Sequence, residues 1–265
     1  MYRQMYYAAN SFASNKKKAM KRFTNKVVFI TGGSRGMGAG IAKRMAAEGA
    51  HVVITYVHSA DQAKQVVDAI TKTGQQALAI QADNASPNEI NEAIEKAVAT
   101  FGRIDILVNN AGVYIGKPLA EYTLEDFDST MSVNVRAVFL ASQKAAQYMN
   151  ESGRIITIGS NMADRVAHAT GSLYAMSKSA LIGLTKGLAR DLGNRGITVN
   201  LIQPGPVDTD MNPANTALAD VLRSGMAIPT YGQPEDIAEL VTYLASEASW
   251  YMTGASLTID GGFSI

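Results

Sequence analysis

The chain has 265 residues, 47% of them hydrophobic, a length and an apolar content that suit one α/β domain with a substantial core. It contains no cysteine, which excludes disulfides, cysteine-ligated zinc and a thiol nucleophile, and agrees with a cytoplasmic location. The formal net charge of +1 argues against a nucleic-acid-binding protein, and no apolar run approaches the roughly 18 residues of a membrane span.

Residues 1–24 differ in composition from the rest of the chain. Seven basic residues and no acidic residue fall within residues 1–26, which leaves 17 basic and 23 acidic residues for the remainder. We predict a flexible extension or an expression remnant at residues 1–24, with an organelle-targeting peptide or a contact to an anionic surface as the alternatives. Residues 25–265 are expected to form the folded domain.

From Lys26 onward, stretches typical of strands and of helices alternate. The expected strands are continuous apolar runs, as buried parallel strands require. They cover residues 27–31, 51–56, 77–81, 104–109, 154–159, 197–202 and 255–259. The helices expected between them cover residues 38–48, 60–73, 87–101, 123–150, 174–193 and 234–246. This alternation predicts right-handed crossovers and a doubly wound parallel sheet of about seven strands with helices on both faces.

A glycine-rich turn joins the first expected strand to the first expected helix. It reads Thr31-Gly-Gly-Ser-Arg-Gly-Met-Gly38, and Gly32, Gly36 and Gly38 would let the backbone turn tightly and lie against a phosphate. The amides and the dipole of the following helix N-terminus would face the anion. The turn lacks the Gly-Lys-Ser/Thr ending of a P-loop, which argues against nucleotide hydrolysis.

Tyr174 and Lys178 are four residues apart in an expected helix, so their side chains share one face. A lysine cation beside a phenol favours the phenolate and would lower its pKa from about 10, which makes the tyrosine usable as a proton donor or acceptor. Ser160 follows the strand expected at 154–159 and could polarise a carbonyl oxygen held between it and the tyrosine. Taken alone, the spacing fits an ordinary helix face better, because Tyr-x-x-x-Lys often occurs by chance.

Taken together and in order, the motifs of residues 24–265 resemble those of the short-chain dehydrogenases/reductases. The matching blocks are Thr31-Gly-x-x-x-Gly-x-Gly38, Asp83, Asn109-Asn-Ala-Gly112, Asn134, Ser160, Tyr174-x-x-x-Lys178 and Pro204-Gly-x-x-x-Thr209. The resemblance implies a single-domain Rossmann fold. It also implies an oxidoreductase that transfers hydride between a nicotinamide and a ketone, an aldehyde or a 3-oxoacyl group, or the corresponding secondary alcohol. The segment 160–174 is most similar to the 3-oxoacyl-carrier-protein reductases, although no Arg/Lys cluster for a carrier is evident beside the site.

The resemblance assigns four catalytic residues. Tyr174 would be the proton donor to the carbonyl oxygen, and Ser160 would hydrogen-bond that oxygen as charge develops. Lys178 would lower the tyrosine pKa and bind the nicotinamide ribose. Asn134 would hold a water in the proton relay.

A larger set is implied to bind the cofactor. Asp83 would contact the adenine, Val207 and Thr209 would hold the carboxamide, and Asn109 would line the same cleft. The full set comprises Gly32, Ser34, Arg35, Gly36, Met37, Gly38, Tyr56, His58, Ser59, Asp83, Asn84, Asn110, Ala111, Gly112, Tyr174, Lys178, Pro204, Gly205, Val207 and Thr209.

The residues after the second strand bear on the choice of cofactor. NAD enzymes of this fold place an Asp or Glu there to bond the ribose 2′-hydroxyl, but the sequence reads Thr55-Tyr-Val-His-Ser59. Arg35 in the glycine turn could reach a 2′-phosphate through two hydrogen bonds, helped by His58, Ser59 and Lys64. We therefore predict NADP(H) rather than NAD(H); the alternative for Arg35 is a solvated loop charge.

The substrate side is less well specified. The predicted contacts are Ser160, Asn161, Tyr114 and Met211, with Ile115, Met162, His168 and Met226 as further candidates. Their mixed polarity fits a modest ketone or aldehyde, and His168 is better explained as a surface residue than as a catalyst. Residues 206–228 could form a mobile lid.

A regulator is the alternative function. Residues 203–215 also resemble reductase-like biofilm-dispersal proteins that bind cyclic di-GMP, which could show little or no turnover. The complete set of Asn134, Ser160, Tyr174 and Lys178 favours an enzyme, because a pure binder needs none of it. The resemblance further implies a homotetramer or homodimer assembled through the helices at 123–150 and 174–193, and no metal site is predicted.

Overall fold

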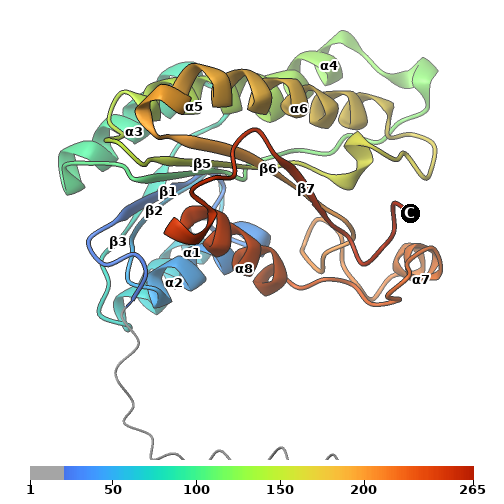
Figure 1. Cartoon of the computed structure of the whole chain (residues 1–265). Helices are drawn as coiled ribbons and strands as arrows, with labels where there is room; N and C mark the ends of the chain where they lie inside the picture. The colour runs from blue at the N-terminus through green and yellow to red at the C-terminus, as the bar shows by residue number, and fades with distance from the viewer. Residues whose placement is uncertain (1–20) are drawn as a thin grey trace, which may run out of the picture.

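Seven parallel strands form one sheet between two layers of helices in the computed structural model, which describes residues 21–265 (Figure 1). The strands are β1 (Val27–Ile30), β2 (His51–Tyr56), β3 (Ala77–Gln81), β4 (Ile106–Asn109), β5 (Arg154–Ile158), β6 (Thr198–Pro204) and β7 (Ser256–Ile259). Their order across the sheet is β3-β2-β1-β4-β5-β6-β7, and all neighbouring pairs are parallel. The predicted fold is confirmed.

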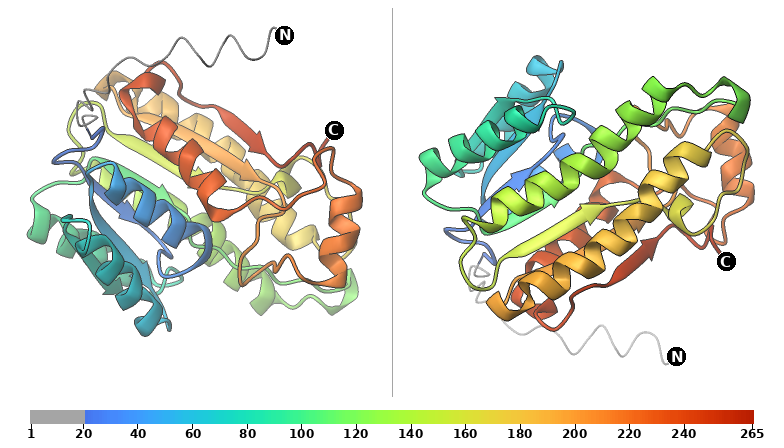
Figure 2. Two further views of the ribbon diagram at one scale, coloured as in Figure 1. Left: turned by 90° about the horizontal axis from the view of Figure 1, so that it is seen from below. Right: turned by 90° about the horizontal axis from the view of Figure 1, so that it is seen from above.

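The helices divide between the two faces of the sheet (Figures 1 and 2). One face is covered by α1 (Gly36–Ala47), α2 (Ala60–Thr71) and α8 (Pro234–Ala245). The other is covered by α3 (Pro87–Phe101), α4 (Leu124–Met131), α5 (Ala137–Ala146) and α6 (Ser172–Leu192). Strands β1, β4, β5 and β6 are buried along their whole length, which explains why β1 and β4 are almost wholly apolar and why no strand of this group alternates strictly between apolar and polar residues.

Two segments differ from the sequence prediction. The single helix expected at 123–150 is α4, a π-helical turn at Ser132–Arg136, and α5, which ends at Ala146. The predicted lid region contains the short helix α7 (Ala217–Ser224), which begins where the Thr216 hydroxyl accepts a hydrogen bond from the amide of Ala219. A helix of eight residues has too short a periodic pattern to be recognised from sequence.

The folded part of the chain begins before residue 25, the start expected from the sequence. Phe23 is buried, with 3% of its surface exposed, and its amide donates to the carbonyl oxygen of Glu48. The rest of the predicted extension, residues 1–20, lies outside the described residues. Within residues 21–265, none of the helices combines the length and the apolar character that a membrane crossing needs.

The order of the strands determines where a ligand can bind. From β1 the chain proceeds outward to β2 on one side, whereas β4, its other neighbour, leads to β5 on the opposite side. Such a reversal opens a crevice at the carboxyl ends of the strands. Helices α4 and α7 both project beyond the sheet at this end, one from each layer (Figure 1).

Candidate active site

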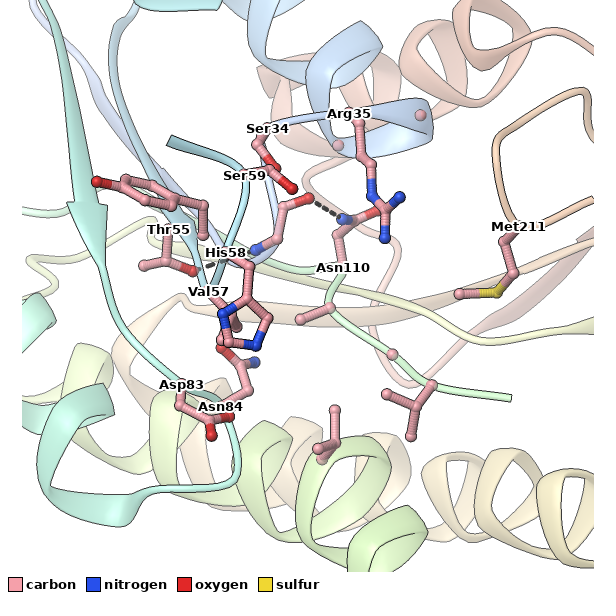
Figure 3. A pocket seen from close by; sticks show the side chains of 18 of the residues that line it. Ser34, Arg35, Thr55, Val57, His58, Ser59, Asp83, Asn84, Asn110 and Met211 are labelled. Atoms are coloured by element: carbon pink, nitrogen blue, oxygen red, sulfur yellow. Dashed lines mark hydrogen bonds between the residues drawn. The ribbon is translucent and has the colours of Figure 1, made fainter. Parts of the chain in front are cut away.

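A cavity of about 520 Å³ lies at the carboxyl ends of β1, β2 and β4 (Figure 3). Most of the residues predicted to bind a cofactor line it: Gly32, Ser34, Arg35, Gly36, Met37, Gly38, Tyr56, His58, Ser59, Asp83, Asn84, Asn110, Ala111, Gly112 and Thr209. Met211, predicted on the substrate side, also lines this cavity. The structure therefore brings five separate chain segments, at 32–38, 56–59, 83–84, 110–112 and 209–211, together around one space.

The glycine turn forms one wall of this cavity. Gly32 and Gly36 have φ values of 65° and 53°, a region that favours glycine. A Cβ atom at Gly38 would lie 2.3 Å from the carbonyl oxygen of Gly32 and 2.6 Å from Nδ2 of Asn110. Helix α1 begins at Gly36, so its first amides are directed toward the cavity end of the turn. This backbone is shaped for close contact with an anionic group.

Two threonines that stand in the quoted motifs, but were given no role from the sequence, hold the turn in place. The Thr31 hydroxyl accepts hydrogen bonds from the amides of Asn110 (3.0 Å) and Ala111 (3.1 Å). The Thr55 hydroxyl accepts one from the amide of Gly32 at 3.1 Å. Threonine at the end of a strand is also simply a good strand former, so this bonding role cannot be inferred from the residue type.

One end of the cavity carries hydroxyl and cationic groups. Ser34, Arg35 and Ser59 lie together there, whereas Asp83 and Asn84 lie at the opposite end (Figure 3). Nη1 of Arg35 is 3.4 Å from Oδ2 of Asp210, and both side chains are 58% exposed. Exposed ion pairs contribute about 0–1 kcal/mol, so Arg35 can exchange this partner for a ligand at little cost.

Two of the four predicted catalytic residues, Lys178 on α6 and Asn134 in the π-helical turn, lie beside Gly112 at the edge of the cavity, and Tyr174 lies next to Lys178 on α6. Nζ of Lys178 lies 5.6 Å from the centroid of the Tyr174 ring and donates to the carbonyl oxygen of Ile158 at 3.0 Å. A Cβ atom at Gly112, which lines the cavity, would lie 3.4 Å from both Lys178 Nζ and Asn134 Oδ1.

Burial sets the acidity of the tyrosine and of the lysine. It raises the pKa of Tyr174 to about 12, against the opposing influence of the Ser160 hydroxyl, and the neighbouring Tyr114 adds to the rise. Burial also lowers the pKa of Lys178 to about 8. The expectation of a lowered Tyr174 pKa is therefore not met, because burial of the phenol is the largest influence on it and the opposing influence comes from Ser160.

The Ser160 hydroxyl is arranged as a donor. Its Oγ accepts a hydrogen bond from the amide of Met162 at 3.1 Å, where a 3₁₀ turn (Asn161–Ala163) begins. A hydroxyl has one proton and two acceptor positions, so this contact leaves the Ser160 proton available for another oxygen.

Asn134 occupies the π-helical turn and is 1% exposed. Its Oδ1 accepts from the amide of Val113 (2.9 Å), and its Nδ2 donates to the carbonyl oxygen of Val113 (3.0 Å) and to Oγ of Ser177 (3.0 Å). The Ser177 hydroxyl in turn donates to the carbonyl oxygen of Tyr174 at 2.7 Å. Ser177, which the sequence analysis also missed, thus links Asn134 to the tyrosine helix.

Several predicted residues point elsewhere. Asn109 is buried and donates from Nδ2 to Oγ of Ser142 at 3.1 Å, so the prediction that it lines the cavity is wrong. Alternate residues of a strand face opposite sides of the sheet, and Asn110 lines the cavity instead. Asn161 is also buried and donates to Asp260 and Ser264 in the C-terminal turn.

Three further predicted residues, Val207, Gly205 and Tyr114, pack closely against neighbouring parts of the chain. Val207 is buried and pairs with Gly232 in an isolated bridge. Gly205, which follows Pro204 at the end of β6, packs against Asp260: a Cβ atom there would lie 2.4 Å from that of Asp260. Tyr114 meets the ring of Tyr174 edge to face at 5.1 Å. Among residues 21–265, no cluster of three or more His, Asp or Glu side chains is suited to a metal ion.

Comparison with known proteins identifies the family. A family model described as enoyl-(acyl carrier protein) reductase matches residues 32–264. The chain belongs to the short-chain dehydrogenase/reductase family. This confirms the resemblance found in the motifs, including both branches suggested by the sequence.

Three members of the short-chain dehydrogenase/reductase family illustrate the likeness. The cyclic-di-GMP-binding biofilm dispersal mediator protein of Escherichia coli (strain K12) is 46% identical over 92% of this chain and 99% of its own length. The 3-oxoacyl-[acyl-carrier-protein] reductase of Synechocystis sp. (strain PCC 6803) is 37% identical over 92% of this chain and 98% of its own. A short-chain dehydrogenase of Burkholderia cenocepacia J2315, solved in complex with NADP, is 53% identical, with a TM-score of 0.91 and coverage of 92% of this chain and 100% of that one.

Proposed function

We propose that the protein is an NADP(H)-dependent reductase of carbonyl groups, which also catalyses the reverse oxidation of secondary alcohols. The observation that carries this proposal is the convergence of Tyr174, Ser160 and Lys178 at the edge of a cavity built around a glycine-rich turn. The NADP held by the Burkholderia relative supports the choice of cofactor.

The cavity fits the proposed cofactor. The glycine turn and the first amides of α1 would receive its pyrophosphate. Arg35, with Ser34, His58 and Ser59, would bind a 2′-phosphate, and residues 57–60, directly after β2, include no carboxylate that would repel it. Asp83 and Asn84 would contact the adenine at the opposite end, and Lys178 would reach the nicotinamide ribose. When bound, the cofactor supplies or accepts the hydride.

The chain's own groups would manage the proton and the charge on oxygen. Because burial raises the pKa of Tyr174 to about 12, its phenol keeps its proton at neutral pH and can donate it to the oxygen of a reduced carbonyl. The free proton of Ser160 would stabilise charge on that oxygen, a contact of a kind worth about 3 kcal/mol in other enzymes. The ammonium of Lys178, with one hydrogen bond to Ile158, retains two N–H groups for the ribose and for the phenolate that remains.

Three cations in the segments predicted to border the substrate are already bound to other groups of the chain, which favours a neutral substrate. Lys117 is paired with Asp126 at 2.7 Å, Arg223 is paired with Asp220 at 2.7 Å, and Arg165 donates to the carbonyl oxygen of Phe263. Exposed apolar side chains lie in the same segments, including Val166 and, on α7, Leu218 and Val221. These contacts support an apolar ketone or aldehyde over a phosphate-bearing or carrier-linked acyl group.

The proposal is tested by following nicotinamide absorbance with a panel of ketones, aldehydes and 3-oxoacyl thioesters. We expect turnover with NADPH in the parent and a loss of at least about 100-fold in kcat in Tyr174→Phe, because general acid catalysis contributes factors of this size or larger. Tyr243→Phe, on α8 and remote from the site, is the matched control and should retain activity. Full activity in Tyr174→Phe, or no turnover by the parent with any member of the panel, would contradict the proposal.

Nucleotide signalling is a second candidate function, which the 46% identity with the cyclic-di-GMP-binding Escherichia coli protein favours. In this case the protein would bind cyclic di-GMP, with or without turnover. Calorimetric titration of the parent and of Tyr174→Phe with cyclic di-GMP separates the two functions. Equal binding by both proteins, without carbonyl reduction by either, would favour the regulator.

A further inference from the structure

The hydroxyl of Tyr122 joins the two loops that lie on either side of Tyr174. It donates to the carbonyl oxygen of Thr170 at 2.6 Å and to that of Ile115 at 3.0 Å, and it accepts from the amide of Lys117 at 3.3 Å. One hydroxyl proton is shared between the two carbonyl groups, of which Thr170 makes the shorter contact. We refer to this arrangement as the Tyr122 bridge.

The Thr170 end of the bridge is conformationally strained. Thr170 has a φ of 71°, in a region that β-branched residues rarely adopt. It precedes Gly171, the residue before α6, and Tyr174 is the third residue of that helix. Such a conformation persists only where the surroundings hold it, and the Tyr122 hydroxyl supplies a hydrogen bond at that peptide.

The Ile115 end of the bridge lies next to Tyr114, the residue whose ring supports the Tyr174 ring. Ile115 directly follows Tyr114, whose ring packs edge to face against the Tyr174 ring at 5.1 Å. The bridge therefore fixes the spacing between the Tyr114 loop and the first turn of α6. These are the two chain segments between which the phenol of Tyr174 meets a substrate in the proposed reaction.

The segment that carries Tyr122 is itself held firmly. Tyr122 ends a 3₁₀ turn (Leu119–Glu121) and precedes α4, where Thr123 and Asp126 form a reciprocal capping box. Nζ of Lys117 contacts both carboxylate oxygens of Asp126, at 2.9 and 2.7 Å. Because these contacts anchor both sides of the tyrosine, its hydroxyl is presented at a defined position.

We propose that Tyr122 is a positioning residue that sets the width of the substrate pocket, an inference that rests on the proposed reductase function. Tyr122 does not line the cofactor cavity, and Val113, which does, is held separately by Asn134. Loss of the Tyr122 hydroxyl therefore changes the binding of the carbonyl substrate and not that of NADPH.

Steady-state kinetics of Tyr122→Phe and of the double variant Tyr122→Phe/Thr170→Gly test the proposal. In Tyr122→Phe we expect KM for the carbonyl to rise about three- to tenfold, the equivalent of one hydrogen bond, with KM for NADPH unchanged. Adding Thr170→Gly should restore most of the carbonyl KM, because glycine adopts a positive φ without support. An unchanged carbonyl KM, an equal rise in both KM values, or a double variant no better than the single one would overturn the proposal.

Amide hydrogen exchange tests the bridge without turnover. We expect faster exchange at residues 171–175 in Tyr122→Phe than in the parent, and parent-like exchange in the control Tyr243→Phe. Unchanged amide exchange at residues 171–175 in Tyr122→Phe would show that the bridge does not hold this segment, even if the parent reduces a carbonyl. If instead the parent reduces no carbonyl while exchange responds as expected, the proposed reaction fails and the bridge remains as a structural feature.

Discussion

Tyr174 shows what residue spacing can and cannot predict. The four-residue interval to Lys178 placed both side chains at one site, and the structure has Nζ of Lys178 5.6 Å from the ring. The direction of the pKa shift was wrong, because it depends on desolvation by residues distant in the chain rather than on the pair itself. The order of the motifs was enough to predict which residues form the site. The protonation of Tyr174 and Lys178 depends on how deeply the folded chain buries them.

A direct consequence concerns the ionisation of Tyr174. A solvent-exposed tyrosine is half ionised at pH 10, whereas Tyr174, with a pKa of about 12, should remain protonated there. We therefore expect the phenolate absorbance of the parent and of Tyr174→Phe to be equal at pH 10 in the absence of cofactor. If the phenolate absorbance of Tyr174→Phe were lower than that of the parent by the equivalent of half a tyrosine, the pKa of Tyr174 would not be raised.

Arg35 should determine the preference between the two nicotinamide cofactors. Hydrogen bonds to a charged group contribute about 1.5–3 kcal/mol, so Arg35→Ala should weaken NADPH binding by about 10- to 100-fold and leave NADH binding unchanged. Fluorescence titration with both cofactors measures this. Lys96→Ala, which removes an exposed charge from α3 on the other face of the sheet, is the control. Equal effects of Arg35→Ala on both cofactors would identify Arg35 as a solvated loop charge.

At the scale of elements, periodicity and end signals predicted nearly every strand and helix. The bounds expected for the second and third strands and for the helix at 87–101 agree with β2, β3 and α3, whose Pro87 start and Gly102 end follow helix-capping rules. The π-helical turn at Ser132–Arg136 was not predictable, because its extra residue is accommodated through contacts of Asn134 with Val113 and Ser177. Local sequence carries no record of such distant partners.

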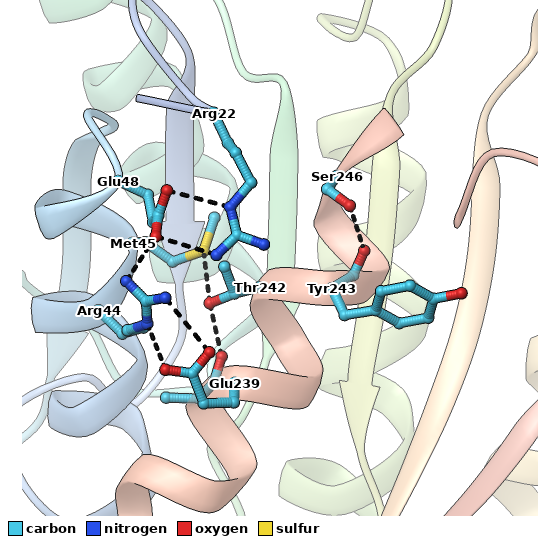
Figure 4. Close-up of polar contacts among 9 residues, drawn as sticks. Arg22, Arg44, Met45, Glu48, Glu239, Thr242, Tyr243 and Ser246 are labelled. Carbon is cyan, nitrogen blue, oxygen red and sulfur yellow. Dashed lines mark hydrogen bonds and ion pairs between the residues drawn. The ribbon is translucent and has the colours of Figure 1, made fainter. Parts of the chain in front are cut away.

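One ion-pair network ties the start of the described chain to two helices. Arg22 and Arg44 both contact Glu48, at 2.9 and 2.6 Å, and Arg44 also contacts Glu239 of α8 at 2.6 Å (Figure 4). Hydrogen bonds from Arg22 and then Arg44 lower the pKa of Glu48 from 4.5 to about 2. A lowered carboxylate pKa stabilises the fold above pH 4.5, and this contribution is lost as the pH falls toward 2.

Glu48→Gln should therefore destabilise the protein in a pH-dependent manner. We expect the free energy of unfolding to fall by about 2 kcal/mol at pH 7, with the difference from the parent shrinking between pH 4.5 and 2. Urea denaturation at several pH values measures the effect. Glu92→Gln, at an exposed position of α3, is the control and should match the parent. A difference that stays constant as the pH falls would exclude the ion pairs as its source.

At the scale of the whole molecule, the topology of the sheet explains why distant residues meet. The glycine turn follows β1, Asn110 follows β4, Ser160 follows β5 and Thr209 follows β6, so each reaches the same end of the sheet. The sequence predicted this gathering because parallel strands share one carboxyl edge. It did not predict that Asn161 would turn to the C-terminal segment, since that contact depends on how two loops pack.

The assembly predicted through the helices at 123–150 and 174–193, which include α5 and α6, remains a prediction at this scale. Phe139 on α5 and Met176 on α6 are large apolar residues left 43% and 44% exposed. If these helices meet a second copy, Phe139→Glu should lower the molar mass measured by light scattering during size-exclusion chromatography, because it buries a charge at the interface. Val221→Glu, on the exposed side of α7, should keep the mass of the parent. An unchanged mass in Phe139→Glu would place any interface elsewhere.

The most direct measurement follows the hydride itself. NADPH deuterated at the transferable position of the nicotinamide is incubated with the carbonyl that the protein reduces, and the product alcohol is analysed by mass spectrometry. We predict deuterium on the carbinol carbon with the parent, and no product above background with Tyr174→Phe, although that variant still binds NADPH. An alcohol without deuterium, or labelled alcohol formed equally well by Tyr174→Phe, would contradict the account.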